Sequence, residues 1–108
     1  MGRLLPVVLL VLASCVNAVA ETGISEARKQ ELENFVVQDC GSCHGLTFKG
    51  GLGSAFSKKK LNAIPTEALY TIIDKGIEGT PMPAWGPLLS SEEIYWIIAY
   101  LRRVSPDE

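Results

Sequence analysis

Five consecutive residues, Cys40-Gly41-Ser42-Cys43-His44, limit what this chain can fold into more than any other feature of its sequence. Cys-x-x-Cys-His is the attachment motif of c-type haem. Two thiols three residues apart on a helical turn can both reach the vinyl groups on one edge of a haem, and the histidine that follows can turn its imidazole onto the iron. Gly41 and Ser42 are small, so the macrocycle can approach the backbone closely. The motif predicts one covalent haem c, with Cys40 and Cys43 as attachment points and His44 as an iron ligand.

Three other interpretations of the two cysteines are weaker. A thioredoxin-like redox pair requires a βαβ context, and no strand-rich segment precedes the motif. A structural zinc site requires four ligands, and residues 21–108 offer only Cys40, Cys43, His44 and carboxylates. A disulfide between Cys40 and Cys43 would close so small a loop that it would add little stability. Covalent haem accounts for both cysteines and for the adjacent histidine.

The candidate for the second axial ligand is Met82. Haem iron is commonly held by His, Met, Cys or Tyr. The chain has no second histidine, and Met82 is its only methionine besides Met1. Pro81 and Pro83 flank it and stiffen the loop by fixing φ. Because a neutral thioether binds iron weakly, a stiff loop favours ligation, and we predict Met82 as the sixth ligand; the alternative is a methionine that fills a gap in the core.

The first twenty residues have the features of a secretory signal peptide. A short, positively charged start precedes an almost wholly apolar run at residues 4–13, and Ala18-Val19-Ala20 is a small-residue cleavage site. We predict cleavage after Ala20, which leaves residues 21–108 as one exported monohaem domain. Residues 12–15, Leu-Ala-Ser-Cys, also resemble a bacterial lipobox, so a lipid anchor on Cys15 is the alternative.

Length and charge exclude other classes of protein. A chain of 108 residues has room for one small domain. Its formal net charge of −2 provides no excess of positive charge for binding nucleic acid. The apolar run at residues 4–13 is too short for a stable membrane span. The sole histidine is assigned to iron, and iron held by two protein ligands has no vacant position for a substrate, so we do not expect an enzyme.

Capping residues and apolar spacing predict the first two helices. Ser25 is a candidate N-cap for a helix over residues 26–40. The apolar contacts of this helix are expected from Ala27, Leu32, Phe35 and Val36. Thr66 is a candidate N-cap for a helix over residues 67–75, which Gly76 ends. The glycine-rich stretch between the two helices, residues 45–65, is predicted to be a loop.

The last helix has the clearest signals. Ser90 and Glu93 form a capping box, and the helix is expected to end near Arg103. Its amphipathic stripe consists of Ile94, Ile97, Ile98 and Leu101. The sequence contains no alternating strand pattern and no internal repeat. We therefore predict an all-α domain of three to four helices, with long loops wrapped around one haem.

A domain of this size buries a modest core, so the haem is expected to complete it. Without the cofactor, the chain should be largely unfolded. The apolar residues expected to surround the macrocycle, or to fill the core beside it, are Leu46, Leu52, Phe56, Leu61, Ile64, Leu69, Ile72, Ile73, Trp85, Leu88, Ile97 and Leu101.

Taken together, these features resemble a class I cytochrome c over essentially all of residues 21–108. The resemblance rests on a first helix ending in Cys40–His44, the Met82 loop, and a final helix carrying Ile97-Ile98-Ala99-Tyr100-Leu101-Arg102. Two runs are also similar to the small cytochrome c encoded in nitrite-reductase gene clusters of denitrifying bacteria. They are Asp39-Cys40-Gly41-Ser42-Cys43-His44-Gly45-Leu46-Thr47-Phe48-Lys49-Gly50-Gly51-Leu52-Gly53 and Gly79-Thr80-Pro81-Met82-Pro83-Ala84-Trp85.

That resemblance implies a periplasmic, monomeric one-electron carrier with His/Met-ligated haem c. Its implied partners are an upstream electron donor and a haem c/haem d1 nitrite reductase. A maturation or haem d1-delivery factor for that reductase is the alternative, and a gas sensor in which Met82 detaches is a third hypothesis. Lys58-Lys59-Lys60, with Lys49, could form a positive rim that steers an acidic partner, or could be a solvated loop.

Two positions depart from the class. After Gly53 the class usually has a proline, whose carbonyl accepts the Nδ1–H of the proximal histidine. Ser54 stands there in this chain, and its own carbonyl can serve instead. Leu32 replaces a glycine that is common eight residues before the first haem cysteine. We therefore expect the first and last helices to cross at a wider separation, with Tyr100 against Phe35 or Val36.

Overall fold

The computed structural model describes Gly2 and residues 23–107. Gly2 apart, the predicted signal peptide at residues 1–20, its cleavage after Ala20 and lipid attachment at Cys15 lie outside the described residues. The described chain is helical and contains no strand, so the predicted all-α class is confirmed. Within this part of the chain, no helix is both long and apolar enough to cross a membrane.

Helix α1, Glu26–Phe35, begins where its cap predicts. The hydroxyl of Ser25 accepts a hydrogen bond from the backbone N–H of Arg28 at 3.1 Å, and this satisfies a donor that the first helical turn leaves free. Leu32 on this helix and Val36 just after it lie one helical turn apart, and both are fully buried. This apolar edge packs against the rest of the domain.

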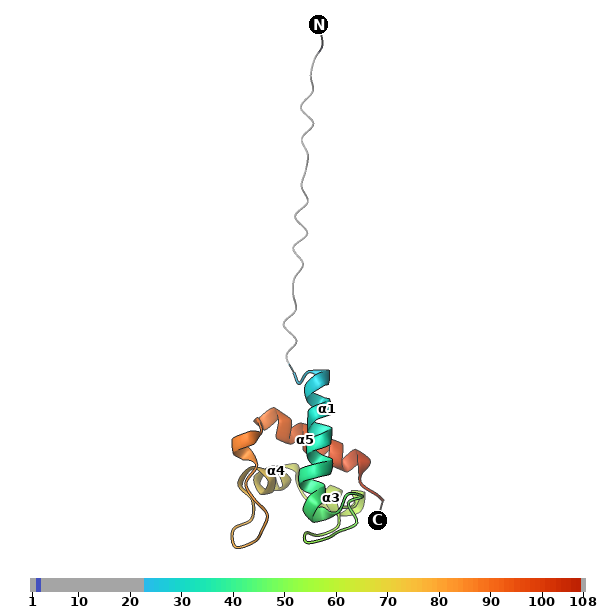
Figure 1. Ribbon diagram of the computed structural model, residues 1–108, viewed down its shortest axis with the longest axis vertical. Helices are drawn as coiled ribbons and strands as arrows, with labels where there is room; N and C mark the ends of the chain where they lie inside the picture. The colour runs from blue at the N-terminus through green and yellow to red at the C-terminus, as the bar shows by residue number, and fades with distance from the viewer. Residues whose placement is uncertain (1, 3–22, 108) are drawn as a thin grey trace.

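The helical run continues beyond α1 into the cysteine motif (Figure 1). A π-helical turn, Val36–Cys40, leads without a break into the short helix α2, Gly41–His44. The predicted helix end at Cys40 is therefore too early. Because the backbone stays helical through the motif, both thiols and the imidazole belong to one continuous helical rod.

A further helix lies in the segment predicted to be a loop. Helix α3, Lys58–Ala63, begins at Ser57, whose hydroxyl accepts a hydrogen bond from a backbone N–H of the first turn at 3.1 Å. The prediction of a loop over all of residues 45–65 is wrong here. The helix is too short to show apolar periodicity, and it buries a single side chain, Leu61.

Helix α4, Thr66–Lys75, starts one residue earlier than predicted. Pro65 is its N-cap, so the prediction of Thr66 as the cap is wrong. The Thr66 hydroxyl instead accepts a hydrogen bond from Arg102 of the last helix at 2.7 Å. Gly76 ends α4 as predicted, and its φ of 70° lies in the left-handed region that glycine adopts without strain.

Helix α5, Ser91–Val104, follows a 3₁₀ turn, Gly86–Leu88, and confirms the predicted capping box. The Ser90 hydroxyl accepts from the N–H of Glu93 at 3.1 Å, and the Glu93 carboxylate accepts from the N–H of Ser90 at 2.9 Å. The predicted apolar stripe is buried along its whole length: Ile94, Ile97, Ile98 and Leu101.

Helix α5 is the element on which the others pack. It contacts α1, α3 and α4, and Figure 1 shows α1 crossing it, with α4 and α3 on either side. The loops at residues 45–57 and 77–85 both extend at the lower end of that view. Tyr100 packs against the buried core and stacks on Trp96 of its own helix, with ring centroids 5.1 Å apart.

Arg28 joins α1 to the start of α5. Its Nε donates to the carboxylate of Glu93, and its guanidinium also pairs with Glu31 at 2.8 Å. The Glu93 side chain is only 14% exposed, whereas that of Glu31 is 65% exposed. The hydrogen bond from Arg28, followed by that from the backbone of Ser90, holds the pKa of Glu93 below its ordinary value of 4.5.

We predict that Glu93→Gln lowers the melting temperature at neutral pH, because it removes the charge that pairs with Arg28 while keeping an acceptor for Ser90. A carboxyl group with a lowered pKa stabilises the fold above its ordinary value of 4.5, and this contribution is lost as the pH falls through its lowered pKa. Thermal unfolding of both proteins should therefore show a difference that shrinks at acid pH. Glu31→Gln is the control and should have the smaller effect. Equal melting temperatures of Glu93→Gln and the parent at neutral pH would contradict this role.

Candidate functional site

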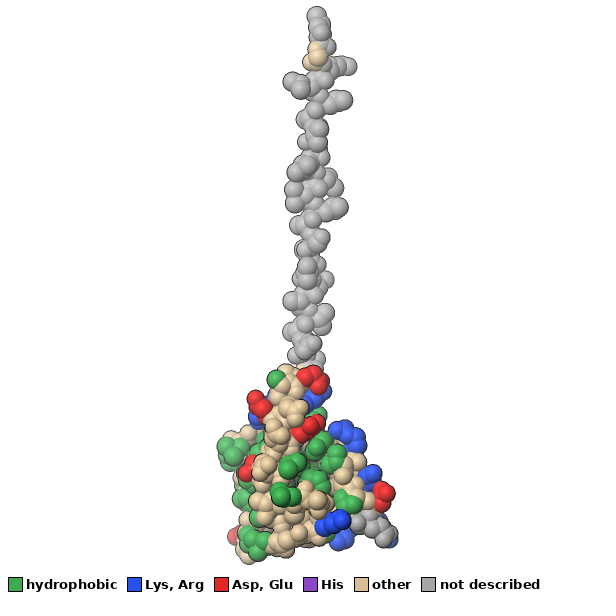
Figure 2. All heavy atoms as spheres, turned by 45° about the vertical axis from the view of Figure 1, so that its right-hand side comes forward, with side chains coloured by type: hydrophobic (Ala, Val, Ile, Leu, Met, Phe, Trp, Pro, Cys, Tyr) green, Lys and Arg blue, Asp and Glu red, His purple; other side chains and the backbone are tan. Residues whose placement is uncertain are grey.

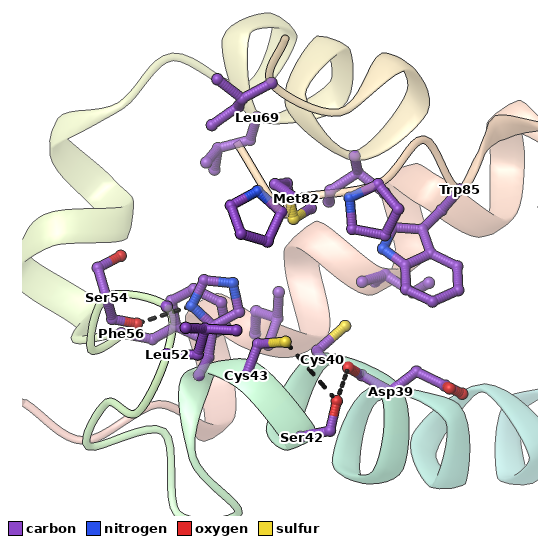
Figure 3. A pocket seen from close by; sticks show the side chains of 18 of the residues that line it. Asp39, Cys40, Ser42, Cys43, Leu52, Ser54, Phe56, Leu69, Met82 and Trp85 are labelled. Carbon is purple, nitrogen blue, oxygen red and sulfur yellow. Dashed lines mark hydrogen bonds between the residues drawn. The ribbon is translucent and has the colours of Figure 1, made fainter. Parts of the chain in front are cut away.

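A cavity of about 480 Å³ opens between the cysteine motif, the Met82 loop and α5 (Figure 3). Its volume lies in the range of small-ligand and cofactor pockets, about 300–1,000 Å³. Helices and loops from the whole described chain contribute to its walls. The apolar side chains that line it, cysteine and methionine apart, are Phe35, Leu52, Phe56, Leu61, Leu69, Ile73, Ile77, Pro81, Pro83, Trp85, Ile97, Ile98 and Leu101.

Cys40 and Cys43 line one wall of this cavity as free thiols. Cys40 ends the π-helical turn and Cys43 lies in α2, so the continuous helical rod sets their spacing. Burial, with a smaller contribution from the charge of Asp39, raises the pKa of the Cys40 thiol to about 11. The Ser42 hydroxyl donates to the carbonyl of Asp39 at 2.9 Å and so stays within the helical rod. Before the haem is attached, Cys40 is therefore a neutral thiol in an apolar environment at neutral pH.

His44 lines the same cavity, and two contacts hold its ring. Its Nδ1 lies 2.7 Å from the carbonyl oxygen of Ser54, and its ring stacks on Phe56 with centroids 4.2 Å apart. A carbonyl only accepts, so Nδ1 carries the proton and Nε2 keeps the lone pair that can bind a metal. The hydrogen bond expected from the Ser54 carbonyl is confirmed, and it does not require proline.

Gly53 makes the position of the His44 ring sterically feasible. A Cβ added at Gly53 would lie 2.7 Å from Cε1 and 2.8 Å from Nδ1 of His44, closer than real Cβ contacts allow. The neighbouring backbone is fixed by the N–H of Gly53, which donates to the carbonyl of Cys43 at 2.8 Å. The loop after α2 therefore closes tightly over the ring because residue 53 has no side chain.

Met82 lies across the cavity from Cys40 and Cys43 (Figure 3). Two backbone hydrogen bonds hold the segment around Met82 against the C-terminal part of α4 and the residues just after it. The carbonyl of Met82 accepts from the N–H of Ile77 at 3.2 Å, and the N–H of Trp85 donates to the carbonyl of Ile73 at 2.9 Å. A Cβ at Gly76 would come within 2.5 Å of the Met82 carbonyl oxygen, so glycine is required there for this close approach.

The structure corrects part of the predicted casing. Leu46 and Leu88 are 66% and 67% exposed and do not line the cavity, and neither do Ile64 and Ile72. The remaining eight predicted casing residues all line it: Leu52, Phe56, Leu61, Leu69, Ile73, Trp85, Ile97 and Leu101. Sequence reasoning missed Phe35, which meets Trp85 edge-to-face with centroids 5.0 Å apart, and Ile98. Both belong to predicted helical stripes, so the stripes were the available signal.

The lysines predicted as a candidate positive rim are not part of the cavity lining. Neither Lys49 nor the run at residues 58–60 lines the cavity, and Asp39 is the only charged residue in the lining that the structure describes. Lys58 pairs with Asp107 at 3.5 Å, and the other two lysines of the run are exposed on α3. On the face drawn in Figure 2, hydrophobic side chains gather in the middle and Lys or Arg side chains toward one edge.

These residues fit a haem c. The walls are apolar enough for a flat macrocycle, and two thiols, the nitrogen donor His44 and the sulfur donor Met82 all line the cavity, with Met82 across it from the thiols. A zinc ion fits less well, because among the described residues no group of three or more His, Cys, Asp or Glu side chains is arranged to hold a metal.

Comparison with known families agrees with this fit. A family model described as cytochrome c oxidase, cbb3-type, subunit III matches residues 27–101, which is most of the chain and includes both the cysteine motif and the Met82 loop. The chain therefore belongs to this family of c-type cytochromes. It binds haem c covalently, and it takes part in electron transfer rather than in catalysis.

The relatives narrow the class to small cytochromes. Cytochrome c55X of Paracoccus denitrificans is 43% identical over 81 residues, which cover 75% of this chain and 79% of that protein. Cytochrome c55X of Pseudomonas aeruginosa is 43% identical over 74 residues, which cover 68% of this chain and 62% of that protein. Among solved structures, a c-type cytochrome NirC matches with a TM-score of 0.72 and 38% identity, over 77% of this chain and all of that one. The predicted fold and cofactor are confirmed.

We predict that Gly53→Ala destabilises the haem-loaded protein by about 1–3 kcal/mol, because the new methyl group overpacks the ring of His44. Chemical denaturation measures the change. Ser54→Ala is the matched control, since the hydrogen bond of His44 is made to the backbone carbonyl of Ser54, which this variant keeps. It should stay within about 0.5 kcal/mol of the parent. Equal stabilities of the two variants would show that the loop does not depend on glycine at residue 53.

Proposed function

We propose that this cytochrome is a periplasmic one-electron carrier that supplies a haem c/haem d1 nitrite reductase. In this proposal Cys40 and Cys43 form the thioether links to haem c, and His44 and Met82 ligate the iron from opposite sides. The observation that carries it is that the two thiols and the imidazole line one apolar cavity, with the thioether of Met82 across it from the thiols.

The surroundings of His44 suit a permanent metal ligand. Donation from Nδ1–H to the Ser54 carbonyl selects the tautomer whose Nε2 binds metal, and it increases the basicity of the ring. Stacking on Phe56 limits rotation of the ring. Together these two contacts hold the ring of His44 in one orientation. The ring therefore needs to move little when the iron changes charge.

The opposite wall suits a carrier rather than a ligand-binding protein. When bound, haem c supplies a one-electron change between ferrous and ferric iron. A thioether from Met82 favours the ferrous form and raises the reduction potential. The apolar walls restrict access of water to the iron. They also raise the reduction potential, because they stabilise ferrous iron, which carries the smaller charge. The backbone bond from Ile77 to Met82 holds the backbone of this residue beside the cavity that its side chain lines.

The proposed partner rests on similarity. The runs at residues 39–53 and 79–85 resemble the small cytochrome of nitrite-reductase gene clusters, and the chain is 38% identical to a c-type cytochrome NirC. Leu52 and Ile77 line the cavity and are 78% and 45% exposed, so apolar surface is available beside the cofactor. Electron-transfer complexes use small, transient interfaces, for which a patch of this kind suffices.

The proposed location rests on the first twenty residues. A signal peptide cleaved after Ala20 releases the domain into the periplasm. Lipid attachment at Cys15 would hold the same domain at the membrane on the periplasmic side. The helical domain over residues 23–107 is the same in both cases.

We predict that a substoichiometric amount of the holoprotein, kept reduced by an excess of a small-molecule reductant that does not itself reduce the enzyme, supports many turnovers of purified haem c/haem d1 nitrite reductase. Stopped-flow absorption of the cytochrome, with nitrite consumption measured in parallel, provides the rate. The double variant Cys40→Ala, Cys43→Ala cannot form the covalent links and should not support turnover. A stable complex with the reductase but no more than one electron delivered per cytochrome would contradict the carrier and favour the maturation or haem d1-delivery alternative.

A further inference from the structure

The segment Thr80-Pro81-Met82-Pro83 has an unusual shortage of backbone donors. Proline has no N–H, so Met82 is the only residue from 81 to 83 that can donate a backbone hydrogen bond. Thr80 and Met82 each precede a proline, which biases both toward extended backbone and excludes a helical turn as the source of hydrogen bonds. The N–H of Thr80 donates to the carbonyl of Ile77 at 3.1 Å, so within the segment only the N–H of Met82 depends on a side chain for its partner.

The hydroxyl of Thr80 supplies that bonding. It accepts the N–H of Met82 at 3.3 Å, and it donates to the carbonyl of Ile77 at 2.7 Å. Ile77 in turn donates its N–H to the carbonyl of Met82 at 3.2 Å. One hydroxyl thus joins the backbone of Met82 to the residue that follows the end of α4. Both polar backbone groups of Met82 are satisfied in this ring.

We infer that Thr80 is a positioning residue for the Met82 thioether. The inference rests on the proposed function, in which Met82 ligates the iron. The two prolines fix φ at residues 81 and 83, but they leave the backbone of Met82 itself free to turn. The hydrogen bonds through Thr80 restrict that freedom at the N–H of Met82, while the bond from the N–H of Ile77 restricts it at the carbonyl. Without the hydroxyl, the N–H of Met82 loses its partner and the loop gains conformations in which the sulfur lies away from the iron.

Because a thioether is a weak ligand, the contribution of the Thr80 hydrogen bonds to iron ligation can be measured. A thioether is neutral and competes poorly with imidazole for ferric iron, so the ferric state reports the restraint most sensitively. The displacement of Met82 by added imidazole measures the free energy that holds the loop closed. One intramolecular hydrogen bond corresponds to about a fivefold change in this equilibrium, or about 1 kcal/mol.

The experiment titrates the ferric holoprotein with imidazole and follows the sulfur-to-iron charge-transfer band in the far red. Thr80→Val keeps the shape of the side chain and removes the hydroxyl, and it should be displaced at about one-fifth of the imidazole concentration that the parent requires. Thr80→Ser restores the hydroxyl and should return the midpoint close to that of the parent. The reduction potential of Thr80→Val should fall, because a looser thioether favours the ferrous form less.

Thr71→Val is the matched control. The Thr71 hydroxyl donates to the carbonyl of Glu67 at 3.0 Å on an exposed turn of α4, away from the cavity lining. Losing it should leave both the imidazole midpoint and the potential unchanged. If Thr71→Val shifts the midpoint as much as Thr80→Val does, a general loss of helix stability explains both, and the inference is wrong.

The outcomes separate this inference from the proposed function. If Met82→Ala leaves the far-red band and the potential of the parent unchanged, Met82 is not a ligand and the proposed function fails together with the inference. If Met82→Ala abolishes the band while Thr80→Val has the midpoint and potential of the parent, Met82 is a ligand and only the role of Thr80 is overturned. A shift in Thr80→Val that Thr80→Ser does not reverse also overturns it.

Discussion

The packing of α1 on α5 is the interaction on which the rest of this domain depends. Leu32 and Val36 on one side, and Ile94, Ile97 and Ile98 on the other, are at most 2% exposed. Because the helical run beyond α1 is unbroken, this crossing also fixes where the cysteine motif lies. Helices α2 and α4 then lie on opposite sides of the cavity, and residues of both line it.

That space explains why so small a chain needs a cofactor. The buried core lies mainly at the helix crossing, with Phe48, Leu61 and Leu89 added to it, while most residues that line the cavity are half-buried or exposed. Haem c binding covers these apolar walls and so contributes to folding as well as to electron transfer. Its covalent attachment suits a domain with little other core, since the links stay closed when the loops open. Stability and redox function therefore depend on the same set of contacts.

Local signals in the sequence predicted those features that depend on neighbouring residues. The capping box of Ser90 and the stripe on α5 are confirmed, and so is the covalent haem c that the cysteine motif predicted. Helix α3 could not be predicted in this way, because Arg102 stabilises it by donating to the carbonyls of Leu61 and Ile64 at 3.3 and 2.8 Å. The same guanidinium binds the Thr66 hydroxyl, which sequence reasoning had assigned to a cap. That Met82 faces the cysteines across one cavity is likewise a property of the folded chain.

The central claim is that the sulfur of Met82 is bound to the iron opposite His44. Met82 is the only methionine besides Met1, so labelling methionine methyl groups with ¹³C places one reporter in the site. In the ferrous holoprotein, a bound Met82 holds its methyl group over the face of the macrocycle, where the ring current shifts the resonance far upfield. The account predicts such a shifted signal. A Met82 methyl resonance at the ordinary position of a methionine in a protein interior would contradict it.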